Sequence, residues 1–79
     1  IESETHQVMK NLKAILEAAN MDFSNVVKCT IFLKDMNQYS SINEVYQKYF
    51  KQNPPAREAV QVSELPKSVN IEISAIAIK

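Results

Sequence analysis

The fold depends on one stretch, Asn53-Pro54-Pro55-Ala56-Arg57-Glu58-Ala59-Val60-Gln61-Val62, in which two prolines precede an alternating run. Pro54 and Pro55 have no amide hydrogen to donate, and they hold the chain extended, so a helix must end before them. The residues that follow predict a strand, because successive side chains of a strand point to opposite faces. One face would carry Ala56, Glu58, Val60 and Val62, and the other Arg57, Ala59 and Gln61.

Arg57 is the first candidate binding residue, because it stands at the start of this strand. Its guanidinium is a planar fork with five donors, which can hold a carboxylate through two parallel hydrogen bonds. The ordinary alternative is a surface or interface arginine in an ion pair. Position alone does not separate the two interpretations.

The composition indicates one small globular domain over residues 1–79 and excludes several functions. Hydrophobic residues make up 46% of the chain, which is ordinary for a globular domain. Nine basic and nine acidic residues cancel without forming runs, so the charge pattern of a nucleic-acid binder is missing. No apolar run predicts a membrane span or a signal peptide. The start at Ile1 rather than a methionine predicts an N-terminally truncated or processed chain.

The single cysteine and the single histidine offer little chemistry. One cysteine excludes an internal disulfide and suits a reducing compartment, the cytoplasm, with a mitochondrial location as the alternative. Cys29 is interpreted as a small buried hydrophobe rather than a nucleophile, because it lies on an apolar strand face. His6 is expected to be exposed in the first turn of a helix. Two soft ligands far apart predict no metal site, and no cofactor is expected.

Two helices are predicted from apolar residues at helical spacing. Ser3 or Thr5 should cap the first helix, and Asn20 should end it in a left-handed conformation. Ser41 with Glu44 forms a capping box for the second helix. The apolar stripe of the first helix is Val8, Leu12, Ile15, Leu16 and Ala19, and that of the second is Ile42, Val45, Tyr46, Tyr49 and Phe50, interpreted as core.

Two further strands are predicted, at Val26–Lys34 and Val69–Ile78, so the order is helix, strand, helix, strand, strand. Val27, Cys29, Ile31 and Leu33 share one face of the first of these strands. The strand–helix–strand unit implies parallel strands with a right-handed crossover, which places both helices on one face of an α+β domain. The opposite face then needs a partner, most simply a second copy of the chain. Its expected residues are Phe32, Arg57, Gln61, Glu72, Ser74, Ile76 and Ile78.

Glu72 is the second candidate site residue, because it is a carboxylate in mid-strand between Ile71 and Ile73. A buried carboxylate is costly unless it is paired, hydrogen-bonded or protonated. One interpretation is a structural salt bridge from Glu72 to Arg57 across the sheet. The functional alternative has Arg57 holding a substrate carboxylate while Glu72 manages a water or a proton.

Five segments occur in the order in which a known family has them. They are Asn25-Val26-Val27-Lys28, Asn43-Glu44-Val45-Tyr46 with Tyr49-Phe50, Pro55-Ala56-Arg57, Leu65-Pro66-Lys67 and Ile71-Glu72-Ile73-Ser74-Ala75-Ile76-Ala77. Over essentially its whole length the chain resembles the reactive-intermediate deaminase family, the Rid or YjgF-like group, also described as endoribonuclease L-PSP or translation inhibitor. The Pro-Ala-Arg and Ile-Glu-Ile signatures together carry most of the resemblance.

The resemblance implies a chorismate-mutase-like mixed sheet with two helices on one face, assembled as a homotrimer. It also implies a cofactor-free hydrolase that converts enamine and imine intermediates of pyridoxal-phosphate enzymes, 2-iminobutanoate and 2-iminopropanoate, to 2-keto acids and ammonia. Arg57 would match the arginine that binds the substrate carboxylate. Glu72 would match the glutamate near the attacking water.

Two departures from the family pattern bear on these expectations. Family members carry strands before the first helix, with a pocket tyrosine and a serine–glycine pair, and this chain has none of these. Many bacterial members have a cysteine two residues after the arginine, where this chain has Ala59. Two other functions therefore stay open, a non-catalytic subunit that binds small carboxylates and an RNA-directed nuclease. The zero net charge and the lack of a histidine pair count against the nuclease.

Overall fold

The chain forms a three-stranded mixed sheet with two helices on one face. The computed structural model describes all of residues 1–79. The elements in chain order are α1 (Glu2–Ala18), β1 (Val26–Leu33), α2 (Tyr39–Gln47), β2 (Ala56–Gln61) and β3 (Ile71–Ala77), with single 3-10 turns at Phe23–Asn25, Met36–Gln38 and Pro66–Ser68. Neither helix combines the length and the apolarity that crossing a membrane would require.

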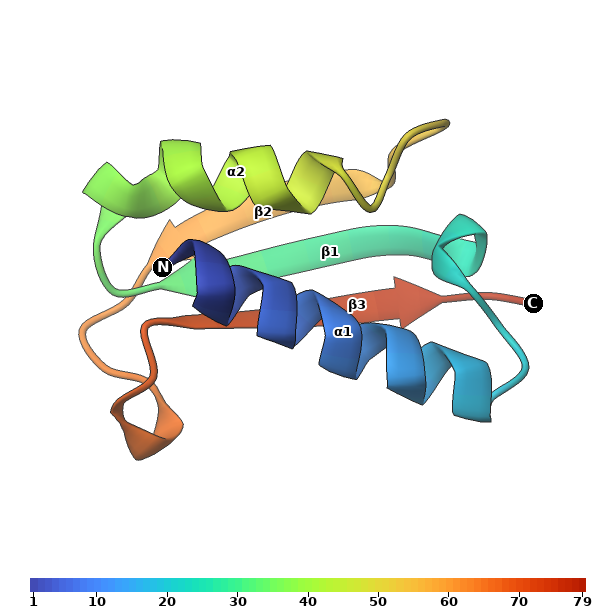
Figure 1. Ribbon diagram of the computed structural model, residues 1–79, viewed down its shortest axis with the longest axis horizontal. Helices are drawn as coiled ribbons and strands as arrows, with labels where there is room; N and C mark the ends of the chain where they lie inside the picture. The colour runs from blue at the N-terminus through green and yellow to red at the C-terminus, as the bar shows by residue number, and fades with distance from the viewer.

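β1 is the central strand, and the sheet order is β2-β1-β3. It pairs in parallel with β2 and antiparallel with β3. A parallel pair needs a crossover, and α2 supplies it, as the predicted strand–helix–strand unit required. Figure 1 shows both helices in front of the sheet, with α1 over β3 and α2 alongside β2. The predicted α+β architecture is therefore confirmed.

The core lies between the helices and one face of the sheet. β1 contributes Cys29, Ile31 and Leu33, all fully buried, which confirms that Cys29 is packed as a hydrophobe. The other buried members of this cluster are Met9, Leu16, Val26, Ile42, Tyr46, Phe50 and Ile71. Tyr46 and Phe50 of the predicted second stripe are thus core residues. The first stripe is partly wrong, since Met9 is buried while Ile15 is 67% exposed.

A bulge at the start of β1 changes which valine is buried. The register of β1 against β3 shifts between Val26 and Lys28. Val26 is therefore buried with Cys29, while Val27, which was predicted to share the face of Cys29, is exposed. A bulge inserts one residue and so moves side chains between faces, which strict alternation does not foresee.

The helix ends differ from the predicted caps at two of three points. α1 begins at Glu2, so Ser3 and Thr5 lie inside it, and the Thr5 hydroxyl donates to the Ile1 carbonyl oxygen at 2.8 Å. α2 begins at Tyr39, before the predicted capping box. The prediction for Asn20 is confirmed, because its φ of 59° is left-handed. In a chain without glycine, asparagine is well suited to this conformation.

The faces of β2 are the reverse of those predicted. Arg57 pairs with Cys29, whose side chain is buried beneath the helices, so Arg57 lies on the helix side of the sheet. Gln61 is on that side too, and its Oε1 accepts a hydrogen bond from the Met36 amide. The opposite side, here called the outer face, carries Lys28, Thr30, Phe32, Glu58, Val60, Glu72, Ser74, Ile76 and the flanking Ile78.

Candidate functional site

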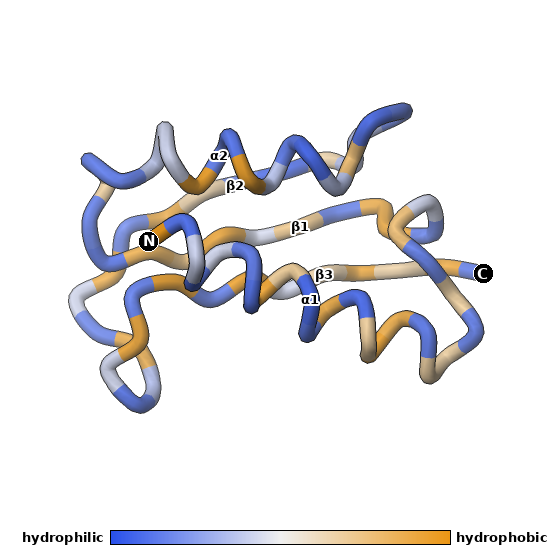
Figure 2. The backbone as a smooth tube through the Cα atoms, viewed as in Figure 1, coloured by the Kyte–Doolittle hydropathy of each residue, from blue (hydrophilic) through white to orange (hydrophobic).

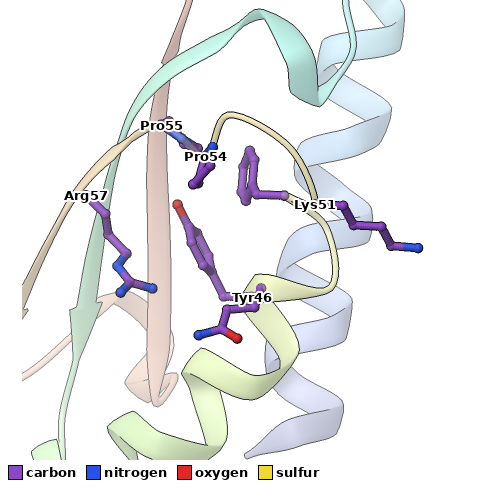
Figure 3. Close-up of a pocket in the computed structure, with 7 residues that line it drawn as sticks. Tyr46, Lys51, Pro54, Pro55 and Arg57 are labelled. Carbon is purple, nitrogen blue, oxygen red and sulfur yellow. The ribbon is translucent and has the colours of Figure 1, made fainter.

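The largest hollow of the molecule lies where α2 ends and β2 begins. It has a volume of about 660 Å³, and it is called the Arg57 pocket here. Its walls come from both sides of the proline-led connection, a hydrophilic loop in Figure 2. Figure 3 shows the lining residues Tyr46, Gln47, Phe50, Lys51, Pro54, Pro55 and Arg57. The two prolines that end the helix therefore also form a wall of the pocket.

Arg57 is held against one face of α2. Its Nη1 atom donates a hydrogen bond to Oδ1 of Asn43. Its Cζ atom lies 5.0 Å from the ring centroid of Tyr46 and 5.7 Å from that of Tyr39. Residues 39, 43 and 46 are spaced by four and three, so they share a helix face that looks toward β2. The two aromatic rings and the hydrogen bond to Asn43 thus hold the guanidinium in place. Its other N–H groups have no hydrogen-bond partner within the chain.

No carboxylate neutralises Arg57. The chain contains two ion pairs, Lys28 with Glu58 at 3.4 Å and Lys34 with Glu64 at 3.1 Å. Neither includes Arg57 or Glu72, so the structural salt bridge between those two residues is not formed. Arg57 therefore presents an uncompensated positive charge in the pocket, which suits an anionic ligand. The Lys51 side chain, by contrast, points away from the hollow in Figure 3.

Tyr46 forms the buried part of the pocket wall. Its side chain is 3% exposed, and its hydroxyl makes no hydrogen bond of standard geometry, with the Cys29 thiol as a weakly polar neighbour. Burial, followed by the neighbouring Cys29 thiol, raises the pKa of Tyr46 far above its ordinary value. Burial likewise raises the pKa of Cys29. Both groups are therefore neutral at physiological pH, and the thiol lacks the thiolate character of a nucleophile.

Glu72 lies elsewhere. It pairs in register with Phe32 on the outer face, and its side chain is exposed. The prediction that Glu72 shares a side of the sheet with Arg57 is therefore wrong. Glu72 borders a smaller groove of about 180 Å³ between α1 and the free edge of β3. The geometry within one chain does not bring the two predicted site residues together.

His6 is not the exposed residue that the sequence predicted. Its Nδ1 atom lies 2.8 Å from the Tyr49 hydroxyl oxygen. The two rings are arranged edge to face, with their centroids 5.9 Å apart. The Tyr49 ring in turn packs against the ring of Phe23, with their centroids 5.6 Å apart. His6 therefore joins α1 to the segment after α2, outside the Arg57 pocket. No three His, Cys, Asp or Glu side chains are grouped so that they could hold a metal ion.

The residues that position Arg57 were missed in the sequence. Tyr46 was assigned to the core and Asn43 to a family signature, and Tyr39 was not singled out. The signal that could have found them is the spacing of Tyr39, Asn43 and Tyr46, which places polar or aromatic groups on one α2 face. Their contact with Arg57 depends on the orientation of β2, which the sequence prediction had reversed.

The fold and the pocket define a small α+β domain in which an arginine without an ion pair lines a pocket between a helix end and a strand. Comparison with known proteins identifies the family. The Endoribonuclease L-PSP family matches residues 1–79, and the chain belongs to this family, which is also known as YjgF or Rid.

Similar proteins and solved structures support the same family assignment. The chain is 56% identical to a RutC family protein of Pyrococcus horikoshii, over 100% of this chain and 63% of that protein. It is 51% identical to the human 2-iminobutanoate/2-iminopropanoate deaminase, over 100% of this chain and 58% of that protein. The crystal structure of E. coli TdcF with bound serine superposes with a TM-score of 0.94 at 38% identity, over 99% of this chain and 64% of TdcF. The chain thus spans about three fifths of the length of these relatives.

Proposed function

We propose that the protein is an imine deaminase, which hydrolyses 2-iminobutanoate and 2-iminopropanoate to 2-keto acids and ammonia. The observation that carries the proposal is Arg57, an arginine without a carboxylate partner at the wall of a 660 Å³ pocket. Both substrates have a carboxylate beside the reacting C=N carbon. The deaminase name of the human relative and the serine bound to TdcF, an amino acid with the same carboxylate, support this ligand class.

The chemistry requires positioning and one proton relay. Arg57 binds the substrate carboxylate through its unpartnered N–H groups and so fixes the neighbouring imine carbon. Water adds to that carbon while a base takes its proton, and the nitrogen is protonated. The C–N bond of the resulting carbinolamine then breaks, a C=O bond forms and ammonia leaves. Glu72 is the proposed base, because a carboxylate can accept the proton of the water and return it to the leaving nitrogen.

Glu72 can serve this role only from another copy of the chain, since it lies on the opposite side of the sheet from Arg57. We therefore also propose a homotrimer in which the outer face is buried. The exposed apolar residues of that face favour association, with Ile76 56% exposed and Ile78 61% exposed beside Phe32 and Val60. A site between subunits would then combine Arg57 of one copy with Glu72 of the next.

A coupled assay tests the proposed reaction. Threonine dehydratase releases the imine, and added protein should accelerate the appearance of 2-ketobutyrate and ammonia. Arg57→Lys should reduce the acceleration strongly, because an ammonium cannot reproduce the bidentate fork. Lys10→Gln, on the exposed side of α1, is the matched control for loss of one positive charge and should keep full activity. An unchanged rate with Arg57→Lys would contradict the proposal.

The same samples separate the two alternatives. A non-catalytic carboxylate-binding subunit would bind 2-ketobutyrate without accelerating its release. An RNA-directed nuclease, the activity in the family's description, would cleave RNA and bind it with a strong dependence on salt. The balance of nine basic and nine acidic residues offers little attraction for a phosphate backbone.

A further inference from the structure

The contact between Tyr46 and Arg57 joins a buried residue of the pocket wall to an exposed one. Tyr46 is fixed in the core, whereas Arg57 is a solvent-exposed side chain with several rotatable bonds. The guanidinium carbon lies 5.0 Å from the Tyr46 ring centroid, within the distance at which a cation is attracted to an aromatic face. A rigid ring can therefore hold a flexible cation in one orientation.

We propose that Tyr46 is a positioning residue, whose ring fixes the plane of the Arg57 guanidinium so that its free N–H groups face the pocket. Asn43 completes this arrangement by accepting from Nη1, which leaves the remaining donors for a carboxylate. The nature of the bound carboxylate rests on the proposed function. The orientation of Arg57 by Tyr46 does not, and it can be measured without a ligand.

The ring, and not the hydroxyl, is the part of Tyr46 that acts. The hydroxyl oxygen is buried, makes no hydrogen bond of standard geometry, and has the Cys29 thiol as its neighbour. In Figure 3 it points toward Pro54 and Pro55, while the guanidinium of Arg57 lies beside the ring. A hydroxyl whose neighbour is a weakly hydrogen-bonding thiol contributes little to stability. Tyr46→Phe should therefore keep the position of Arg57 and leave the melting temperature nearly unchanged.

A graded series changes the electrons of the ring while preserving its shape. Phenylalanine, 4-fluorophenylalanine and 3,4,5-trifluorophenylalanine at position 46 carry a progressively weaker negative charge on the ring face. Affinity for 2-ketobutyrate, measured by calorimetry, should match wild type with phenylalanine. It should fall stepwise with fluorination, to about two- to fivefold below wild type, the factor expected for an exposed cation–π contact. In the Arg57→Lys background the same series should produce a smaller change.

The Arg57 guanidinium itself provides the readout that a merely structural role of Tyr46 would not move. The ¹⁵N heteronuclear NOE of the Arg57 Nε–H group, whose signal is assigned by its loss in Arg57→Lys, should be that of an ordered group in wild type and in Tyr46→Phe. It should fall in Tyr46→Leu, where the guanidinium is no longer held in one orientation. Tyr46→Met, whose unbranched and flexible side chain adapts better to the shape left by the ring, serves the same purpose where Tyr46→Leu does not fold.

Two results would overturn the proposal. One is a loss of affinity in Tyr46→Phe as large as in the trifluorinated variant, which would assign the effect to the hydroxyl. The other is an Arg57 Nε–H heteronuclear NOE that stays as high in Tyr46→Leu as in wild type. If wild type binds no 2-ketobutyrate, the proposed function fails, whereas the Nε–H signal still decides the positioning of Arg57.

Discussion

Arg57 and Glu72 lie on opposite faces of the sheet. Arg57 pairs with Cys29 and Glu72 pairs with Phe32, and these two β1 positions are three residues apart. An odd separation along a strand places side chains on opposite sides. Arg57 therefore lies on the helix side of the sheet while Glu72 lies on the outer face, and a reaction that uses both must draw them from different subunits.

Mixing two inactive variants tests this arrangement. Arg57→Lys and Glu72→Gln subunits, unfolded together at equal amounts and refolded, should recover about one quarter of wild-type deaminase activity, because one in four random subunit pairs joins an intact Arg57 to an intact Glu72. Each variant refolded alone should stay inactive. Mixtures without recovery would contradict a site shared between subunits, and an active Glu72→Gln protein refolded alone would show that Glu72 is dispensable.

The outer face should mediate association. Ile76→Lys places a charge on this face and should convert the assembly to monomers in sedimentation equilibrium. Ile15→Lys is the matched control, because Ile15 is similarly exposed but lies on α1. Wild-type protein that sediments only as a monomer would contradict the proposed trimer, as would equal effects of the two substitutions.

Cys29 should react slowly while the protein is folded. Its side chain is fully buried, and burial raises its pKa, so both access and thiolate content are low. An alkylating reagent at pH 7 should label the folded protein far more slowly than the same protein in denaturant, as followed by intact mass. Rapid labelling of the folded protein would show that the thiol is accessible.

Glu4 should make stability depend on pH in the acid range. Its carboxylate accepts from the Asn70 side-chain amide at 2.7 Å and from the Asn70 backbone at 3.2 Å. These bonds lower the pKa of Glu4 from its ordinary value of 4.5. A lowered folded-state pKa means that the contribution is complete above 4.5 and is lost as pH falls through the folded value.

The melting temperature of wild type should therefore fall more steeply than that of Glu4→Gln between about pH 5 and about pH 3. The glutamine still accepts a hydrogen bond but does not titrate in this range. Glu2→Gln, in the same turn of α1, controls for the lost charge. Parallel curves for wild type and Glu4→Gln would show that the contact with Asn70 does not contribute.

Element order and fold class could be predicted because the apolar patterns of α1, α2, β1 and β3 are strong. In β3 the alternation of Ile71, Ile73 and Ala75 with polar neighbours assigned the faces correctly. The strand–helix–strand order then required α2 to cross over between parallel strands. These features follow from local periodicity and chain connectivity.

The face of Arg57 could not be predicted in this way. In β2 the apolar residues Ala59 and Val60 are adjacent, so their side chains point to opposite faces. Whichever face of the strand is covered, one of the two is therefore buried. The register of β2 against β1 decides which side is covered, and this register depends on long-range pairing rather than on local sequence. The same limit hid the contact of Tyr46 with Arg57, although both residues were singled out.

The most direct test of the central claim is calorimetric titration of 2-ketobutyrate into wild type, Arg57→Lys and Glu72→Gln, with a melting curve for each. Arg57→Lys should weaken binding by about 1.5–3 kcal/mol, the range for a charge-assisted hydrogen bond, without a matching loss of stability. Glu72→Gln should leave binding nearly unchanged while suppressing imine hydrolysis. Equal affinity of wild type and Arg57→Lys would contradict the assignment of this pocket as the carboxylate site.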